Sequence, residues 1–305
     1  PLPPRDPQPT TGEMLQAALG IGARIVRRGL QKLGCVDQWF IAYRFGAPSW
    51  DGDLPGFTRL QPPKDRIWAD PFPLYRDGRY FIFFEEVIFA TGKGHIAVLE
   101  VHPDGSHSEP VKVLECPYHL SYPFLIEQEG ELFMVPESGQ NRSVELYRCL
   151  HFPDRWQLEK VLLHDIACAD ATFHRSDGHW WMFVNIGAEG TELYDELHLY
   201  YADELQGEWQ AHPCNPVKSD VCSARPAGRL FLHHGALHRP AQICAPLYGS
   251  GVVIAEVQQL TPLAYRERQV ARILPSPGRG VLGIHTLNRS GDLNVVDGFA
   301  RRSRV

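Results

Sequence analysis

The sequence predicts an all-β protein: a five-bladed β-propeller closed by N- and C-terminal strands and preceded by one N-terminal amphipathic helix. Three observations predict this fold. A strand–turn–strand unit recurs five times at a spacing of about 50 residues. Gly 27 and Pro 25 form about 17% of the 305 residues, against about 12% in average usage, which indicates many tight turns. A helical pattern of apolar residues occurs only near the N-terminus.

The N-terminal region divides into a linker and a helix. Residues 1–9 (PLPPRDPQP) are too rich in proline for a regular element. A helix is expected over residues 10–34, because Thr10 and Glu13 have the spacing of a capping box and apolar residues follow at helical intervals. The polar side of this helix is basic. It could therefore pack on its own protein or make peripheral contact with an anionic membrane.

The propeller is expected over residues 38–305. Each unit has one strand, a turn centred on Asp-Gly, Glu-Gly or Ser-Gly, and a second strand rich in aromatic and β-branched residues. The copies are ADPFPLYRDGRYFIFFEE (69–86), SYPFLIEQEGELFMVPES (121–138), ADATFHRSDGHWWMFVN (169–185), a degenerate CSARPAGRLFLHHGALHRPAQ (222–242) and GIHTLNRSGDLNVVDGF (283–299).

Further strands complete the blades. Two β-rich runs follow each of the first four units, at 95–101, 111–114, 144–149, 156–163, 197–202, 209–212, 252–260 and 265–273. The fifth unit has too little chain after it, so its outer strands are expected from 38–44 and 57–61. Such closure would remove the exposed sheet edges that promote aggregation.

Composition excludes several functions. A net charge of −6 argues against a nucleic-acid partner, and no apolar run approaches the roughly 20 residues that cross a bilayer. Seven cysteines without a CxxC pair, and no HExxH motif, argue against a disulfide framework, a zinc site or another cofactor. A structural ion held by backbone oxygens stays open.

The expected location is the cytoplasm, or the inner face of the membrane through the N-terminal helix. Buried, reduced cysteines and the lack of a signal-peptide pattern support this expectation. The chain opens at Pro1 rather than Met, which is consistent with a trimmed form or the tail of a longer polypeptide.

Polar residues recur where the inner strands begin. The equivalent positions hold Asp70, Tyr122, Asp170, Arg225 and His285. Because inner strands line the central channel of a propeller, we expect these side chains to converge at one mouth of it, as in a site for a polar ligand. The alternative is that both aspartates cap turns or brace neighbouring blades.

Several stretches resemble a known family. They are WADPF, SYPF, VPES, DATF, ARPAG, HRPAQ, GIHTLN and VVDGF, in this order. They look like the N-terminal β-propeller module of glucosamine inositolphosphorylceramide transferase-type proteins, here expected as a bacterial homologue from polysaccharide biosynthesis. The resemblance covers about residues 38–300. More distantly, the layout is similar to the five-bladed furanosidase superfamily of arabinanases, xylosidases and fructosidases.

The furanosidase resemblance implies roles for three carboxyl groups. Asp70 in ADPF matches the general base, and Asp170 in DATF matches the aspartate that tunes pKa and orients. The general acid, a Glu on blade four in that superfamily, is replaced by Arg225, which cannot donate a proton at neutral pH. Glu137 in VPES is the first candidate for the acid, with Glu85 and Glu86 as others.

Positive charge near the aspartates suggests an anionic ligand group. The candidate substrate-binding residues are Tyr122, Arg225, Arg239, His238, His285, Trp68 and Lys93. An Arg fork binds phosphate or carboxylate, so the expected ligand is a glycan or a sugar phosphate. Trp68 and Tyr122 are the candidates for stacking on a sugar ring. The alternative is that Arg225 and Arg239 form structural salt bridges with the two aspartates.

The sequence therefore predicts a carbohydrate-active propeller in glycan biosynthesis or processing. Glycosyl transfer or glycoside hydrolysis would occur in a polar, partly cationic channel site, with Asp70 as base or nucleophile, Asp170 as orienting residue and Glu137 as acid. The alternative, which leaves the enzyme question open, is a non-catalytic glycan-binding or scaffold module attached to a transferase domain.

Overall fold

The computed structural model describes residues 35–48, 51–187, 193–276, 278 and 280–303. The linker expected over 1–9 and the helix expected over 10–34 lie outside these residues. Residues Gln38–Ala300 form one compact unit. Among the described residues, the single helical element is the 3-10 turn Gly139–Asn141, and no helix could span a membrane.

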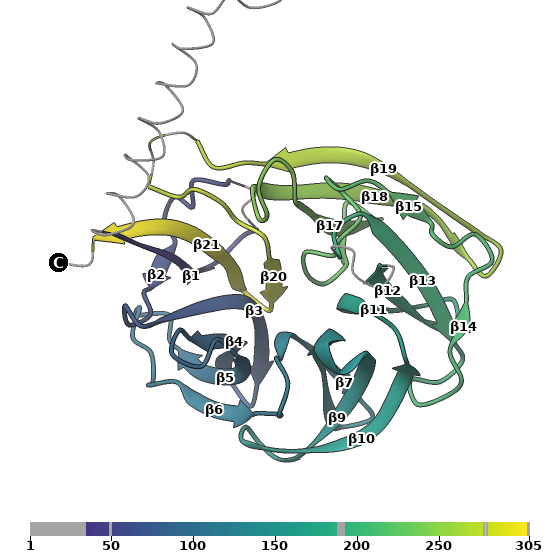
Figure 1. The fold of residues 1–305 in the computed structure, drawn as a ribbon, viewed down its shortest axis with the longest axis horizontal. Coiled ribbons are helices and arrows are strands. Elements are labelled where there is room, and N and C mark those ends of the chain that lie inside the picture. The colour runs from purple at the N-terminus through teal and green to yellow at the C-terminus, as the bar shows by residue number, and fades with distance from the viewer. Residues whose placement is uncertain (1–34, 49–50, 188–192, 277, 279, 304–305) are drawn as a thin grey trace, which may run out of the picture. The chain divides into compact units, whose positions relative to one another are not determined.

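The compact unit is a five-bladed β-propeller, as predicted (Figure 1). Blade one contains β3 (Arg66–Arg76), β4 (Arg79–Ile88), β5 (Gly94–Val101) and β6 (Val111–Leu114). Blade two contains β7 (Ser121–Gln128), β8 (Glu131–Ser138), β9 (Ser143–His151) and β10 (Arg155–His164). In both blades neighbouring strands are antiparallel and follow one another in the chain.

The remaining blades vary this plan. Blade three contains β11 (Cys168–Ser176), β12 (His179–Ile186), β13 (Glu196–Ala202), β14 (Gln210–Ala211) and β15 (Lys218–Ser219). Blade four contains β16 (Phe231–His233), β17 (Ala236–Ile243), β18 (Gly251–Thr261) and β19 (Ala264–Ile273). The fifth sheet has the order β2 (Thr58–Leu60), β1 (Cys35–Phe45), β21 (Leu293–Ser303) and β20 (Leu287–Ser290), so it combines strands from both ends of the described chain.

The hairpin turns explain why the repeat folds in this way. Asp77–Gly78 and Asp177–Gly178 have positive φ at both residues, 51° and 78° in the first and 51° and 83° in the second. Two consecutive positive φ values are required by the type I′ turn, whose twist matches that of the strands. Gly adopts this region without strain and Asp tolerates it.

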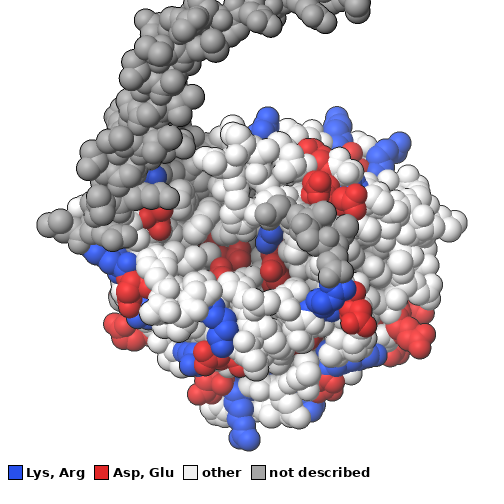
Figure 2. Space-filling model, in the orientation of Figure 1, with Lys and Arg blue, Asp and Glu red and all other residues white. Residues whose placement is uncertain are grey.

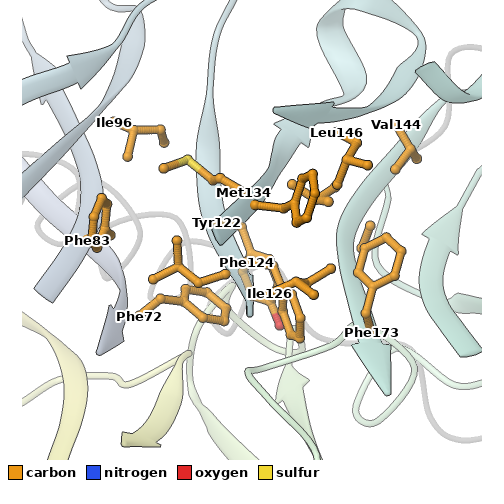
Figure 3. Packing of buried hydrophobic residues seen from close by; sticks show 14 of the residues in the cluster. Phe72, Phe83, Ile96, Tyr122, Phe124, Ile126, Met134, Val144, Leu146 and Phe173 are labelled. Atoms are coloured by element: carbon orange, nitrogen blue, oxygen red, sulfur yellow. The ribbon is translucent and has the colours of Figure 1, made fainter. Parts of the chain in front are cut away.

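Aromatic side chains fill the space between neighbouring blades. Figure 3 shows the cluster shared by blades one to three, in which the Phe72 ring lies 4.7 Å from Tyr122 and 5.5 Å from Phe124. Phe124 in turn lies 5.6 Å from Phe173 on β11. These contacts join three inner strands and fix the positions from which their polar residues project.

Candidate functional site

The same backbone irregularity occurs in three inner strands. Asp70, Tyr122 and Asp170 have φ of 50°, 44° and 54°, in the left-handed region. The register between the inner strand and its neighbouring strand shifts at each of these residues, so each of them lies in a β-bulge. Residues other than Gly are strained in this conformation, and such strain gathers at functional sites. The bulges therefore mark one end of the channel as the candidate site.

The second strand of each blade contributes another polar residue at this end. Glu85, Glu137 and Asn185 pair in register with the residues that precede the bulges. Gln242 on β17 and Asp297 on β21 hold the corresponding places in blades four and five. Figure 2 shows a hollow at the centre of one face with Asp or Glu side chains in it. We call Asp70, Glu137, Asp170 and Asp297, with Arg225 and His285, the acidic cluster.

Asp297 organises the blade-five side of the acidic cluster. Its side chain is fully buried and accepts the backbone N–H groups of His285 and Thr286, each at 2.9 Å, and of Asp70 at 3.0 Å. His285 Nδ1 lies 2.5 Å from Asp297 Oδ2, and its Nε2 lies 3.5 Å from Asp70 Oδ1. The imidazole is thus placed between two carboxyl groups.

The Thr286 hydroxyl indicates where one proton lies. Thr286 Oγ1 is 2.6 Å from Asp297 Oδ2 and 2.8 Å from Asp70 Oδ1. A hydroxyl has a single proton to donate, so both contacts are full hydrogen bonds only if one carboxyl is protonated. A protonated Asp70 can donate to Thr286, which then donates to an ionised Asp297.

The pKa values agree with this assignment. Burial raises the pKa of Asp70 to about 7, although the His285 charge opposes the change. Burial also opposes ionisation of Asp297, but the His285 charge and hydrogen bonds outweigh it and lower that pKa. Burial alone would lower the pKa of His285, but the charges of Asp297 and Asp70 outweigh the effect of burial and raise this pKa to about 9.

Asp70, His285 and Asp297 offer ligand atoms within 4.8 Å of one another, close enough for one metal ion. A metal there would displace the bond between His285 Nδ1 and Asp297 and the three backbone donors that Asp297 accepts. It would also meet an imidazole whose pKa is raised, whereas metal ligation needs the neutral ring. The donor set therefore fits a protonated His285 better than a metal ion.

Arg225 joins the two carboxyl groups on the other side of the acidic cluster. Its Nε donates to Asp170 Oδ2 at 2.6 Å and its Nη2 to Asp170 Oδ1 at 3.3 Å, while Nη2 lies 3.4 Å from Glu137 Oε2. Gln242 also donates to Asp170 at 2.7 Å. Asp170 is therefore held in a fixed orientation.

Glu137 is in a different electrostatic position. Burial raises its pKa well above the usual value, and the Asp170 charge adds to this effect, while Arg225 opposes it. Its side chain is 17% exposed and that of Arg225 11%, against 1% for Asp170. Glu137 is thus a carboxyl group whose pKa is raised and whose side chain is partly exposed to solvent.

Three aromatic residues border the acidic cluster. Trp39 stacks on His285 with ring centroids 4.1 Å apart, and Tyr248 meets the same ring edge-on at 5.2 Å. Arg225 lies 5.2 Å from the Tyr248 ring and 5.6 Å from that of Tyr194. Aromatic faces beside a few fixed polar groups are typical of small-ligand sites.

The structure brings together five of the residues singled out in the sequence: Asp70, Glu137, Asp170, Arg225 and His285. Of the two expected salt bridges, Arg225 pairs with Asp170. Arg239 instead pairs with Glu267 through Nε and Nη2, each at 2.8 Å, and also donates to the carbonyls of Ser223 and Ala224. Its guanidinium is therefore used within blade four.

The other expected ligand-binding residues have local partners. Tyr122 is fully buried, with its hydroxyl 2.7 Å from both Thr172 Oγ1 and the Gly228 N–H. Trp68 packs on Phe84. His238 Nδ1 lies 3.1 Å from the Ala236 carbonyl, and Lys93 donates to the Cys116 carbonyl at 2.7 Å. None of these contacts joins them to the acidic cluster in the described part of the chain.

Sequence reasoning missed part of the site. The missed residues are Asp297, Thr286, Gln242, Asn185, Trp39, Tyr194 and Tyr248. A signal for the second-strand positions was present: Glu85, Glu137 and Asn185 each follow the bulge residue of their blade by the same interval. Tyr194 and Tyr248 lie outside the strands, where no periodicity points to them.

Residues 61–296 match the family described as glucosamine inositolphosphorylceramide transferase 1, N-terminal. The chain is 37% identical over 203 residues to glucosamine inositolphosphorylceramide transferase 1 of Oryza sativa subsp. japonica, covering 65% of this chain and 27% of the relative. It is 32% identical over 231 residues to the protein of that name from Arabidopsis thaliana, covering 73% and 30%. The chain thus spans less than a third of these relatives. They are plant proteins, so they do not support the expected bacterial origin.

Solved structures share the fold at low identity. The catalytic domain of a GH62 α-L-arabinofuranosidase from Coprinopsis cinerea has a TM-score of 0.59 at 11% identity, covering 78% of this chain and 92% of that one. A family 117 glycoside hydrolase from Zobellia galactanivorans has a TM-score of 0.54 at 13% identity, covering 87% and 90%. At these identities the likeness shows the propeller fold alone.

Proposed function

Because the chain belongs to the family of the N-terminal domain of glucosamine inositolphosphorylceramide transferase 1, we propose that it is a carbohydrate-active propeller acting at the acidic cluster. The name of the relatives and the fold support a carbohydrate-related role. The observation that carries the proposal is the divided protonation of the carboxyl groups: the pKa of Asp70 is raised to about 7, that of Glu137 is raised, and that of Asp297 is lowered.

Such a division provides the two groups that glycosyl chemistry needs. Glu137 retains its proton and reaches solvent, so it can protonate a leaving oxygen as general acid. Asp70, with a pKa near neutrality, can accept a proton from an attacking water or sugar hydroxyl as general base. Asp170, held by Arg225 and Gln242, orients the site.

The available hydrogen-bond acceptors favour a sugar that carries an amino group. The sugar phosphate considered from sequence depended on positive charge gathered around the two aspartates, but Asp170 and Glu137 already contact the Arg225 guanidinium. Asp70, Glu85, Glu137 and Asp297 add further carboxyl groups. A ligand ammonium would meet carboxyl oxygen acceptors here, whereas a phosphate would find the Arg225 guanidinium already paired. Trp39 and Tyr248 supply apolar faces for the ring.

A specific observation favours a second candidate, a glycan-binding module without catalysis. Asp70 is only 5% exposed, and the chain covers 27% of the rice relative, so the chemistry could reside in a transferase domain outside the matched region. The same acidic cluster would then bind sugar hydroxyl and amino groups without transferring them.

Binding and turnover measured side by side separate the candidates. An array of neutral and amino-sugar glycans identifies a ligand, and Asp70→Asn and Glu137→Gln are then compared with wild type. Loss of a general acid or base should reduce turnover by about 10²–10⁴-fold while the glycan still binds. Glu256→Gln, in an exposed ion pair on β18, is the control and should change neither.

Equal loss of turnover and binding in both variants would point to the binding module. If wild type binds no glycan on the array, both candidates fail.

A further inference from the structure

The other end of the central channel carries positive charge. Four residues after Asp170, Arg225 and His285, the innermost runs of blades three, four and five hold His174, Arg229 and Arg289. Four residues span up to about 13 Å when the backbone is extended, so these side chains come from positions further along the innermost runs than the acidic cluster. We call His174, Arg229 and Arg289 the cationic end.

Arg229 lacks the partners that other enclosed arginines have. Its Nη2 donates to the Leu125 carbonyl at 2.5 Å, and its guanidinium lies 4.5 Å from the Phe124 ring centroid. In the described part of the chain no carboxylate lies within 4.0 Å of it. A guanidinium has five N–H donors, so most of those on Arg229 have no protein acceptor. Arg225 and Arg239, by contrast, both form forked ion pairs.

The electrostatics of the cationic end agree with an uncompensated charge. Burial lowers the pKa of Arg229 to about 10, because its effect exceeds the opposing effects of Tyr122 and Glu127. Burial likewise lowers the pKa of His174, and the Arg229 charge lowers it further. A bound anion would relieve both effects.

A cavity lies beside two of these residues, Arg229 and Arg289. It has a volume of about 90 Å³ and is lined by Arg229, Arg289, Asn288, Leu230 and Leu287 among others. A single water needs only about 10–15 Å³ by the same kind of measure, so the cavity has room for a small polyatomic ion. Its apolar walls would strengthen the attraction between such an ion and the arginines.

We propose that the cationic end binds an oxyanion, a phosphate, sulfate or carboxylate group, with Arg229 as its principal ligand. Arg229 supplies free N–H donors in the planar fork that matches two oxygens of such a group. Arg289, which also lies 3.7 Å from Asp292, adds positive charge beside it, whereas His174 is mainly neutral because its pKa is lowered. This binding is independent of the proposed chemistry at the acidic cluster.

Sulfate is the first probe, because its charge does not change near neutral pH. Sodium sulfate is titrated into the protein by calorimetry at constant ionic strength, with wild type, Arg229→Met and Arg268→Met compared. Arg268 is 64% exposed and pairs with Glu256, so it is a matched control. We expect sulfate to bind wild type saturably. The dissociation constant should be at least about tenfold higher for Arg229→Met, because the charge-assisted pair is lost. It should be unchanged for Arg268→Met.

Two results would overturn the proposal: wild type that shows no saturable sulfate binding, or Arg229→Met that binds sulfate as wild type does. If Arg229→Met does not fold, Arg289→Met takes its place and must weaken binding measurably. Glucose 1-phosphate and glucose then distinguish the sources of the anion. Tighter binding of the sugar phosphate than of sulfate identifies a phosphorylated sugar, and equal binding identifies a free anion.

Discussion

At the scale of single residues, the protein holds Asp70, His285 and Asp297 in contact and gives them different protonation states. Only Asp297 receives three backbone N–H groups, and hydrogen bonds to the charged form stabilise a carboxylate. Asp70 accepts none of these donors and is buried, so of these two carboxyl groups it keeps its proton to the higher pH. Chemically identical side chains are thus distinguished by the backbone around them.

This arrangement predicts that the free energy of unfolding falls as pH rises. Folded Asp70, with a pKa of about 7 against a usual 3.8, holds a proton that the unfolded chain has lost, so its contribution is full below pH 3.8 and is lost as pH rises through 7. His285, raised from 6.5 to about 9, makes a contribution that is lost between those values. Urea unfolding over pH 4–9 measures both effects.

Asp70→Asn should reduce the slope between pH 4 and 7 by up to about 1.4 kcal/mol per pH unit, the effect of one proton. Asp77→Asn is the control, because Asp77 is an exposed turn residue with nearly the same φ, 51° against 50°. An unchanged slope in Asp70→Asn would contradict the assignment of the proton.

The sequence was sufficient to identify Asp70, Asp170, Arg225 and His285 as neighbours, because equivalent positions of a repeat converge on the axis of a propeller. It was insufficient for Tyr122, which occupies the same position but is fully buried, with its hydroxyl bonded to Thr172 and Gly228. Equivalent positions of the repeat place the backbone at the same point of each blade. The neighbouring blades, however, determine what the side chain at that position contacts.

At the scale of elements, blade four is secured by a buried ion pair. Arg239 on β17 and Glu267 on β19 are two strands apart in the sheet and are 0% and 5% exposed. Lys218 and Tyr265 also contact Glu267, so its oxygens have several donors. The pair therefore holds an inner and an outer strand together across β18.

Glu267→Gln should lower the free energy of unfolding by about 3–5 kcal/mol, because it leaves the buried Arg239 charge without a counter-charge. Glu256→Gln removes the exposed partner of Arg268 between β18 and β19 and should cost at most about 1 kcal/mol. Chemical denaturation of the two variants makes the comparison. Similar losses in both would show that burial does not determine the strength of these pairs.

The strands were predictable to within a few residues because their turns are local. Asp77–Gly78 and Asp177–Gly178 specify a hairpin whatever surrounds them. The bulges at Asp70 and Asp170 have no such sequence signal, since neither aspartate is followed by Gly. Contacts with other blades hold them there: Asp297 binds the Asp70 N–H, and Arg225 and Gln242 hold the Asp170 side chain.

At the scale of the whole propeller, the two ends of the channel differ in charge. Carboxyl groups gather at the first position of the innermost runs, and His174, Arg229 and Arg289 follow four residues later in three of these runs. This difference could not be read from the net charge of −6, which averages over the molecule. It arises because a basic residue stands at the same four-residue offset in three of the five blades.

The most direct test of the central claim is the protonation of Asp70 and Glu137 in the folded protein. Side-chain carboxyl ¹³C resonances, assigned with Asp70→Asn and Glu137→Gln, are followed by NMR as pH is varied. We expect Asp70 to titrate at about 7 and Glu137 above its usual 4.5, and both resonances to shift when a glycan binds. Titration of both groups near 4, as in model peptides, would contradict the account.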